Sequence, residues 1–322
     1  MKLNILISSA GRRGQLIECF REAGRDLGIE VGIFASDVRP ELSAACQLAD
    51  GSFGVPRCDA PDFVPALLAA CAERSVRLIV PTIDLELAVL SEQRARFAAA
   101  GVEIAVSEPE VIALARDKER TARELAGAGV RTPGTVAGAR YLSEPTVLGW
   151  PVIVKPRSGS SSVGMVRPQS PEEAAAAIRA MPDAIVQELW AGREYTVNLF
   201  FDRSGILRCS IPHLRIETRG GEVSQGRTED VPVLRAMARD VARALAGARG
   251  ALCFQVIVTE RGEAALFELN ARFGGGYPLA HRAGARFAQW LIEEAAGLPS
   301  SASDAWKAGV TMLRHDTAVF LE

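Results

Sequence analysis

The chain has 322 residues and lacks the patterns that would identify a zinc, redox or membrane protein. It holds only three histidines, and its six cysteines form no Cys-x-x-Cys pair, so the sequence carries no zinc or thiol redox motif. No apolar run reaches half of the roughly 18 residues that a membrane-spanning helix needs, and the first residues do not resemble a signal peptide. We therefore expect a cytoplasmic protein with reduced cysteines and no membrane partner.

An excess of charge of one sign is also missing. Lysine and arginine number 37 against 39 aspartate and glutamate, which leaves a net charge of −2. Such a chain produces no field that gathers a polyanion, so nucleic acid is not an expected partner. With 48% hydrophobic and 24% charged residues the composition is that of an ordinary globular protein. The length predicts about two domains, and we expect the ligands to be small molecules.

The first third of the chain alternates short apolar runs with longer helical patterns. We expect strands at 4–8, 31–36, 78–80 and 103–106, with helices at 15–27, 62–74 and 85–100. This series predicts a Rossmann-like parallel sheet with helices on both faces, which binds ligands beyond the carboxyl ends of its strands. Gly11 and Gly14 supply only half of a dinucleotide-binding pattern, and we interpret them as a tight turn with close helix packing.

The rest of the chain has a different character. A helical stretch at 109–129 leads through a turn at 132–134 into a region dominated by strands, which predicts an α+β unit with antiparallel sheets. The expected strands are 151–155, 184–188, 194–201, 207–211, 252–258 and 264–270, and the expected helices are 171–180 and 231–246.

The first chemically informative stretch is the strand that ends at Lys155 and the loop of small residues after it, including Ser158, Gly159 and Ser160. Backbone amides in such a loop can approach and wrap phosphate oxygens, and the lysine adds a positive charge. A flexible hairpin connection is the alternative interpretation. The spacing excludes a P-loop, in which the lysine follows the glycines.

A second stretch joins two apolar runs, 252–258 and 264–270, through a five-residue loop. If this loop closes symmetrically, Gln255 lies opposite Glu268, and side-chain alternation puts Asn270 and Arg272 on the same face. Phe267 and Leu269 would then face the core. One carboxylate and two amide oxygens suit Mg²⁺, and the arginine can neutralise a transferring phosphoryl group. A solvated strand face is the alternative, but the three glycines at 274–276 favour close approach of the backbone to a ligand.

Two further stretches carry weaker signals. The short Gly-bearing connection after Glu188 and Leu189 can present main-chain groups to an adenine, and Glu194 can accept ribose hydroxyls, although solvated acids are the alternative. We interpret residues 211–227 as a polar loop in which Arg215 or Arg227 binds a substrate carboxylate or belongs to scattered surface charge.

Three other polar residues have less certain roles. His213 is expected to be partly buried and hydrogen-bonded. Asp84 and Glu86 fall in an exposed loop, where they either receive a substrate amine or remain solvated.

Together these stretches resemble the ATP-grasp superfamily, most closely the branch around the carbamoyl-phosphate synthase large subunit. The ordered set that carries the resemblance is Asp117-Lys118, Lys155 with its loop, Glu188, Glu194, Gln255, Glu268-Leu269-Asn270 and Arg272. The loop is richer in serine than in glycine, and Lys118 stands where synthase halves usually carry arginine. A second synthetase half is absent, so synthesis of carbamoyl phosphate itself is not expected.

The resemblance implies a preceding-ATP-grasp domain at 1–108, a small lid subdomain at 109–188 and a C-terminal subdomain with the metal site at 189–322. It implies that Lys118, Lys155, Ser158, Gly159 and Ser160 bind ATP phosphates, that Glu188 and Leu189 contact the adenine and that Glu194 binds the ribose. Gln255, Glu268 and Asn270 would hold Mg²⁺, as two ions for which Mn²⁺ can substitute, and Arg272 with Lys155 would act in catalysis.

The implied activity is that of an ATP-dependent carboxylate–amine ligase. The enzyme would activate a carboxylate as an acyl phosphate for attack by an amine or another nucleophile, and we expect a homodimer. The alternative is a regulatory or partner-binding protein that keeps the nucleotide cleft without ligation.

Overall fold

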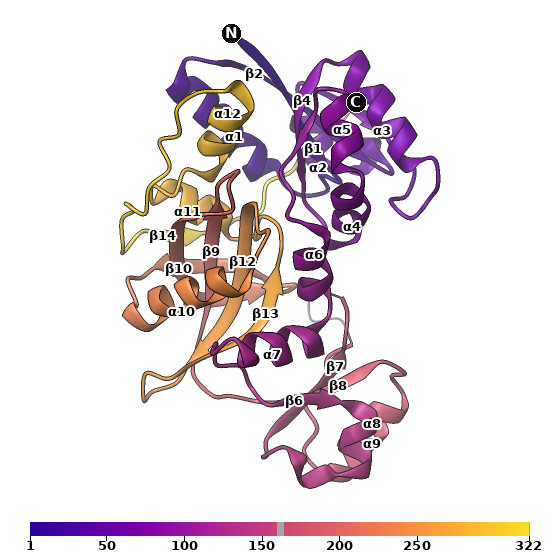
Figure 1. Cartoon of the computed structure of the whole chain (residues 1–322), viewed down its shortest axis with the longest axis vertical. Coiled ribbons are helices and arrows are strands. Elements are labelled where there is room, and N and C mark those ends of the chain that lie inside the picture. Colours follow the sequence, from indigo (N-terminus) through magenta and orange to yellow (C-terminus); the bar gives the residue numbers. More distant parts are fainter. Residues whose placement is uncertain (160–163, 322) are drawn as a thin grey trace.

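The computed structural model describes residues 1–159 and 164–321, so Ser160 of the expected phosphate loop lies outside the described residues. Three sheets follow one another along the molecule, the first at the top of Figure 1 and the smallest at the bottom. Within the described ranges no helix is long and apolar enough to cross a membrane.

The first sheet is parallel, as the sequence predicts, with strand order β3-β2-β1-β4-β5. Its strands are β1 (Lys2–Ser8), β2 (Glu30–Asp37), β3 (Gly51–Gly54), β4 (Val76–Pro81) and β5 (Glu103–Ile104). The helices are α1 (Gly14–Leu27), α2 (Ala44–Leu48), α3 (Phe63–Glu73), α4 (Asp84–Glu92) and α5 (Arg94–Ala99), with a 3₁₀ turn at Pro40–Leu42. Strand β3 was not expected, because its four residues are half-buried or exposed and show no apolar run.

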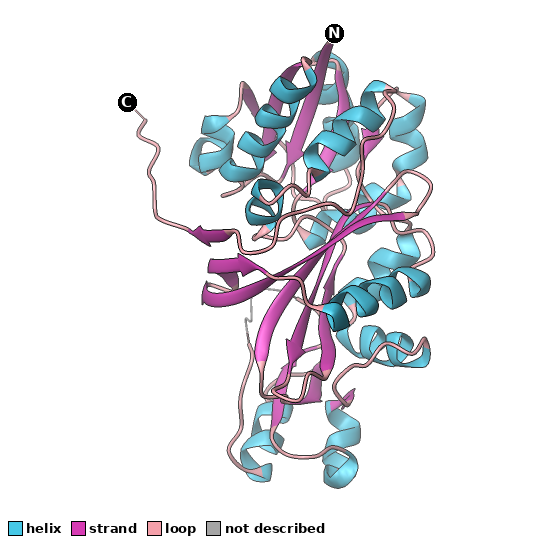
Figure 2. Cartoon of the chain, turned by 90° about the vertical axis from the view of Figure 1, so that its left-hand side faces the viewer, coloured by secondary structure: helices cyan, strands magenta, loops and turns pink. Residues whose placement is uncertain are grey.

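The second sheet is antiparallel and runs through the middle of the molecule, where its long strands fan out in Figure 2. Its order is β13-β12-β9-β10-β11-β14, with β9 (Arg193–Phe201), β10 (Leu207–Arg219), β11 (Glu222–Thr228), β12 (Gly250–Val258), β13 (Ala264–Asn270) and β14 (Thr311–Leu313). Helices α10 (Pro232–Ala244), α11 (Tyr277–Arg282) and α12 (Phe287–Ala296) pack against it.

The expectation of a polar loop at 211–227 is wrong. These residues form the β10–β11 hairpin, in which Arg219 pairs with Glu222 across a turn at Gly220 and Gly221. Both glycines adopt positive φ angles, which suits a tight hairpin turn. The strand pattern is hidden in the sequence because polar residues occupy both faces of the outer half of the hairpin.

The third sheet is small, with order β6-β8-β7, and consists of β6 (Thr135–Ala137), β7 (Val152–Pro156) and β8 (Ala184–Glu188). It packs with α8 (Gly138–Ser143) and α9 (Pro171–Arg179) around a hydrophobic cluster of its own, beside a 3₁₀ turn at Pro145–Val147. We call residues 135–188 the lid and the remaining described residues the body.

The expected lid subdomain at 109–188 does not pack as one unit. Its first two helices, α6 (Pro109–Arg116) and α7 (Lys118–Gly127), pack separately from the rest. Their apolar residues, among them Val111, Leu114 and Leu125, belong to the large core that strands of the first and second sheets share. The two helices are therefore part of the body, and the separately packed unit begins only at β6. Amphipathic periodicity predicted both helices but not the core on which they pack.

Candidate functional site

Two adjoining cavities lie where the lid, the central sheet and the N-terminal domain meet. The lid cavity has a volume of about 390 Å³ and extends between the lid and strands β12 and β13. The sheet cavity, of about 510 Å³, extends from there to the loop that begins α4. Lys118, Ser158, Gly159, Gln255 and Glu268 line both cavities, so the two spaces join at these residues.

Lys155 reaches the lid cavity from the end of β7. Its side chain is buried, and its Nζ donates a hydrogen bond of 2.7 Å to Oε1 of Gln187 on β8. Burial lowers the pKa of Lys155 to about 8, although the carboxylate of Glu268 opposes the shift. A desolvated ammonium of this kind binds an incoming phosphate strongly, because water does not screen it.

Lys118, at the start of α7, faces Lys155 from the other side of the loop. Its Nζ donates to the carbonyl oxygen of Gly159 at 2.5 Å, and burial lowers its pKa as well. Ser158 and Gly159 line both cavities, and Gly159 has a positive φ of 110°. The structure therefore places two lysines and the described part of the small-residue loop together, as expected for a phosphate site.

The connection after β8 forms another wall of the lid cavity, with Glu188, Leu189 and Trp190 along it. The Glu188 carboxylate accepts a hydrogen bond from the Gly134 amide at 3.0 Å, so it already has a partner in the protein. Sequence reasoning missed both Gln187 and Trp190 as lining residues. Strict alternation could not have indicated both, because residues three apart in a strand lie on opposite faces of the sheet.

Glu194 and Arg215 were expected to bind different parts of the substrates, but they pair with each other. The distance from the Arg215 Nε to the Glu194 Oε1 is 2.6 Å, and the Arg215 side chain is only 8% exposed. Both residues line the lid cavity, and Arg215 also reaches the sheet cavity. Arg215 further donates to the Gly221 carbonyl at 2.9 Å, which fixes the hairpin turn over the cavity.

Arg227 lines neither cavity. On β11 it follows Gly226, the residue that pairs with Arg215, and side-chain alternation therefore directs it to the opposite face of the sheet. There its guanidinium pairs with Glu229 at 2.7 Å. The expectation that Arg227 binds substrate is not supported by this placement.

The expected pairing of Gln255 with Glu268 is confirmed, although the register beside the loop differs by one residue from the expected one, with Val258 opposite Ala264. Gln255 pairs with Glu268 and Cys253 pairs with Asn270. The Asn270 Nδ2 donates to the Glu268 Oε1 at 3.1 Å, so the three expected metal ligands lie together on the cavity wall. Among the described residues no group of three His, Cys, Asp or Glu side chains gathers, and one carboxylate with two amides is what this wall offers.

Phe267 does not face the core as expected. The register of the hairpin shifts between Gln255 and Val256, which leaves Phe267 without a pairing partner opposite it. This irregularity turns the ring into the lid cavity, where the Lys155 Nζ lies 5.7 Å from its centroid. A β-bulge of this kind re-aims one side chain and cannot be inferred from strict alternation.

Arg272 is held by a residue from the N-terminal domain. Its Nη2 donates to the Asp84 Oδ2 at 2.9 Å and to the Asn270 Oδ1 at 3.2 Å. Arg272 and Asp84 are separated by 188 residues in the chain, which is why sequence reasoning did not connect them. Asp84 is thus part of the site, and the first domain completes the wall of the sheet cavity.

Glu86 and His213 are both buried in the protein interior and have hydrogen-bond partners there. Glu86 is fully buried, not exposed as expected, and its carboxylate accepts from the Ser8 and Ser9 hydroxyls and the Thr82 amide. It therefore ties together the loops after β1 and β4. His213 is also fully buried, and its Nδ1 lies 3.1 Å from the Asn198 Nδ2. Burial lowers its pKa to about 3, with Arg215 acting in the same direction, so the ring is neutral.

The three glycines at 274–276 make room for protein side chains. A Cβ on Gly275 would lie 2.6 Å from the Glu222 carboxylate carbon, and one on Gly276 would lie 2.7 Å from the His213 Nε2. All three glycines also line the sheet cavity, so the expectation that they allow close approach of a ligand stays a prediction. Glu222 and Arg13, which pair at 3.5 Å, also line this cavity, and no sequence pattern had indicated them.

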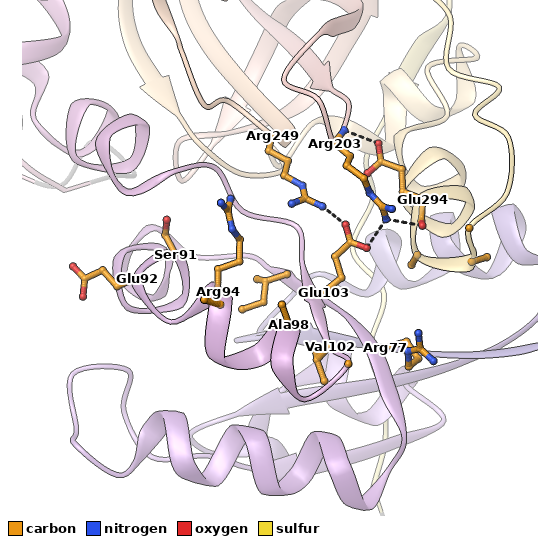
Figure 3. A pocket seen from close by; sticks show the side chains of 16 residues that line it. Arg77, Ser91, Glu92, Arg94, Ala98, Val102, Glu103, Arg203, Arg249 and Glu294 are labelled. Atoms are coloured by element: carbon orange, nitrogen blue, oxygen red, sulfur yellow. Dashed lines mark hydrogen bonds and ion pairs between the residues drawn. The ribbon is translucent and has the colours of Figure 1, made fainter.

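Another cavity, of about 710 Å³, lies elsewhere, between the N-terminal domain and the far end of the central sheet. Figure 3 shows Glu103 of β5 between Arg203 and Arg249, with Glu294 of α12 beside them. None of the residues proposed from the sequence lines this cavity. Its ion pairs connect the two large domains of the body.

Comparison with known proteins identifies two regions of the chain. A family model described as a PylC-like N-terminal domain matches residues 5–105, and one described as an ATP-grasp domain matches residues 115–276. The D-alanine–D-alanine ligase of Halorhodospira halophila is 41% identical over 112 residues, and that of Alcanivorax borkumensis is 33% identical over 173 residues. The matches cover 33% and 49% of this chain, and 34% and 55% of the respective ligases.

Among solved structures, the biotin carboxylase domain of the Hydrogenobacter thermophilus 2-oxoglutarate carboxylase is similar in fold. Its TM-score is 0.73 at 20% sequence identity, and the alignment covers 94% of this chain and 71% of that one. At this identity the likeness establishes the arrangement of domains and no more. The family match covers half of the chain and contains most of the residues that line the two cavities: the chain belongs to the ATP-grasp family, with a PylC-like N-terminal domain.

Proposed function

We propose that this protein is an ATP-dependent ligase that converts a carboxylate into an acyl phosphate and joins it to an amine or another nucleophile. The observation that carries the proposal is the pair of joined cavities. One contains two desolvated lysines, and the other contains Glu268, Asn270 and Arg272 on a single face of the central sheet. The chain spans about a third and about half of the two curated ligases, so their substrates are not transferred to it.

In this proposal the nucleotide occupies the lid cavity. Leu189, Trp190 and Phe267 supply apolar surface for the adenine, and Lys118, Lys155 and the amides of the Ser158–Gly159 loop bind the phosphates. Glu194 binds the ribose while it remains paired with Arg215. The solved biotin carboxylase domain was crystallised with MgADP and bicarbonate, which supports a nucleotide and a small acid as ligands of this fold.

The wall residues fit a magnesium ion. Mg²⁺ takes oxygen ligands and commonly binds through one or two carboxylates together with substrate phosphates. Glu268 supplies a carboxylate and the opposite Gln255 supplies an amide oxygen, while Asn270 lies within hydrogen-bond distance of Glu268. When bound, the ion would neutralise phosphate charge. The resemblance further implies two ions, for which Mn²⁺ can substitute, and we keep this as part of the proposal.

The chain's own groups then act by position and charge. In the first step an oxygen of the substrate carboxylate attacks the γ-phosphorus, and the bond to the bridging oxygen of ADP breaks. Arg272, fixed by Asp84 and Asn270, stabilises the charge of the transferred group. In the second step the nucleophile attacks the acyl carbon and phosphate leaves. The lid excludes water, which would otherwise hydrolyse the acyl phosphate.

The test is ADP formation by the purified chain with MgATP and a panel of carboxylic acids and amines. The proposal requires ADP release that depends on supplying an acid and an amine together. A protein that binds MgATP but releases no ADP with any pair would be a binding protein, the alternative that sequence analysis leaves open.

A further inference from the structure

A third cavity, of about 500 Å³, adjoins the sheet cavity on the side away from the lid. It lies between the start of α1, the β10–β11 turn and residues 314–319, and we call it the α1 cavity. Arg13, Glu222, Gly274 and Gly275 line both this cavity and the sheet cavity. A molecule whose reacting group lies near Arg272 can therefore extend into it.

The α1 cavity has an excess of positive charge. Its lining includes Arg12, Arg13, Arg219 and Arg314 against the carboxylates of Glu18, Glu222 and Asp316. Glu18 pairs outside the cavity with Arg21 at 2.6 Å, and Arg219 pairs with Asp316 at 2.9 Å. Glu222 alone serves Arg13 and Arg314, at 3.5 and 3.1 Å. Within the described part of the chain Arg12 makes no ion pair, so its charge is available to a ligand.

Helix α1 begins at the same cavity with its first turn uncapped. The N-cap Arg13 makes no side-chain cap, and the first turn contains no acidic residue. The amides of Leu16 and Ile17 donate to the Arg13 carbonyl, which leaves those of Gly14 and Gln15 without a hydrogen-bond partner among the described residues. The first amides of a helix have no partner within the helix, and the helix dipole places partial positive charge there. Gly14 and Gln15, the first two residues of α1, line the cavity.

Ser224 on β11 supplies an independent observation. The residue is only 6% exposed, it lines the α1 cavity, and its Oγ has no hydrogen-bond partner among the described residues. A buried hydroxyl without a partner costs free energy, which a ligand that accepts its hydrogen bond recovers. The Nε of Arg314, a residue lining the same cavity, is likewise buried and without a partner.

We infer that the α1 cavity binds a second anionic group of the carboxylate substrate, either a carboxylate or a phosphate, remote from the carboxyl group that is activated. Arg12, the first amides of α1 and the Ser224 hydroxyl would hold this group. The inference rests on the proposed ligase function and adds a substrate class to it: acids that carry a further anionic group.

The experiment measures binding to protein already saturated with MgADP, which occupies the lysines of the lid cavity. Thermal melting is followed at constant ionic strength while inorganic phosphate, glutarate or the singly charged butyrate is added. We expect at least one of the two multiply charged probes to raise the melting temperature more than butyrate. Arg12→Ala should weaken the apparent affinity for that probe about tenfold, whereas Arg25→Ala, at the other end of the same helix, should not change it.

Ser224→Ala separates binding from stability. Removing an unpartnered hydroxyl should leave the melting temperature of the ligand-free protein unchanged or raise it, while the response to the probe weakens several-fold. A response to phosphate alone identifies a phosphorylated acid, and a response to glutarate alone identifies a dicarboxylic acid. Equal responses to all three probes, or responses unchanged by both substitutions, would overturn the inference. If the protein responds to the probe but forms no ADP with any pair of acid and amine, the proposed ligase function alone would be refuted.

Discussion

The two walls of the proposed nucleotide site are held in place by different means. The wall on the body consists of β12 and β13, which lie in the large core shared by both major sheets. The ion pairs of Glu103 with Arg203 and Arg249 further join the domains that form this body. The wall on the lid consists of β7, β8 and their connections, which pack on a small cluster of their own.

Exposed ion pairs are among the contacts that attach the lid to the body. Arg157 pairs with Asp117 at 2.6 Å and with Glu119 at 3.1 Å, and its side chain is 44% exposed. Polar, exposed contacts of this kind are worth little free energy, so they permit a segment to open and close. The comparison teaches a division of tasks: the groups proposed to align the reaction lie on the rigid wall, and the groups proposed to bind the phosphates lie largely on the lid, whose attachment permits movement.

Glu268→Gln should have the largest effect, because it changes the chemistry of the rigid wall alone. The substitution keeps volume and hydrogen bonding but removes the negative charge proposed to hold Mg²⁺. We expect substrate-dependent ADP formation to fall at least about 100-fold, or about 2.7 kcal/mol in barrier, while the nucleotide-induced melting shift persists. Turnover near the wild-type rate at saturating Mg²⁺ would show that this face is ordinary solvated surface.

Lys155→Ala changes the wall on the lid, and we expect it to weaken nucleotide binding, whereas Glu268→Gln should lower turnover and leave binding largely intact. MgATP at about 100 times its dissociation constant should stabilise the wild-type protein by about 2.7 kcal/mol, and the variant should lose most of this gain. Differential scanning calorimetry with and without MgATP measures the change. Lys307→Ala, which replaces an exposed lysine outside both cavities, is the matched control and should retain the full shift. An undiminished shift in Lys155→Ala would separate this lysine from the nucleotide.

The pKa of Lys155 predicts how nucleotide affinity depends on pH. The free protein carries the charged ammonium below about pH 8 and the neutral amine above it. Because phosphates bind the charged form, affinity for MgATP should fall as pH rises through 8, by up to about tenfold per pH unit. Titration calorimetry across this range measures the fall. Lys155→Arg retains its charge throughout and should show no such step. An equal fall in both proteins would assign the titration to another group.

The smallest effects are expected for two ion pairs, one that joins the domains of the body and one that attaches the lid to the body. Glu103→Gln leaves two arginines of the body without their shared carboxylate, and we expect a loss of about 1–2 kcal/mol in the free energy of unfolding with unchanged ADP formation. Asp117→Asn keeps the helix cap but weakens the tie to Arg157, which should cost less than about 0.5 kcal/mol. Its KM for ATP should rise a few-fold.

Chemical denaturation and steady-state kinetics of these two variants test the division directly. If Glu103→Gln changes KM and Asp117→Asn changes mainly stability, the assignment of a rigid body and a movable lid is reversed.

Much of this site follows from local rules. The five-residue loop and the two apolar runs predict the β12–β13 hairpin, and the parallel first sheet follows from the alternation of strands and helices. The pairing of Gln255 with Glu268 also needs the register shift that follows Gln255, because Val258 pairs with Ala264 beside the loop. What could not be predicted depends on contacts distant in sequence. Asp84 reaches Arg272 only because the first domain packs against the second sheet, and a bulge redirects Phe267. Arg227 was misplaced because the hairpin that sets its face is polar on both sides.

The groups proposed to hold the nucleotide already have partners inside the protein. Lys118 is bonded to the Gly159 carbonyl, Lys155 to Gln187, Glu188 to the Gly134 amide and Glu194 to Arg215. Nucleotide binding is therefore an exchange of partners, and its free energy is the difference between new bonds and the old ones. The same internal partners are available again when ADP leaves. They lower the cost of dissociation and let the enzyme return to its starting state without leaving buried charges bare.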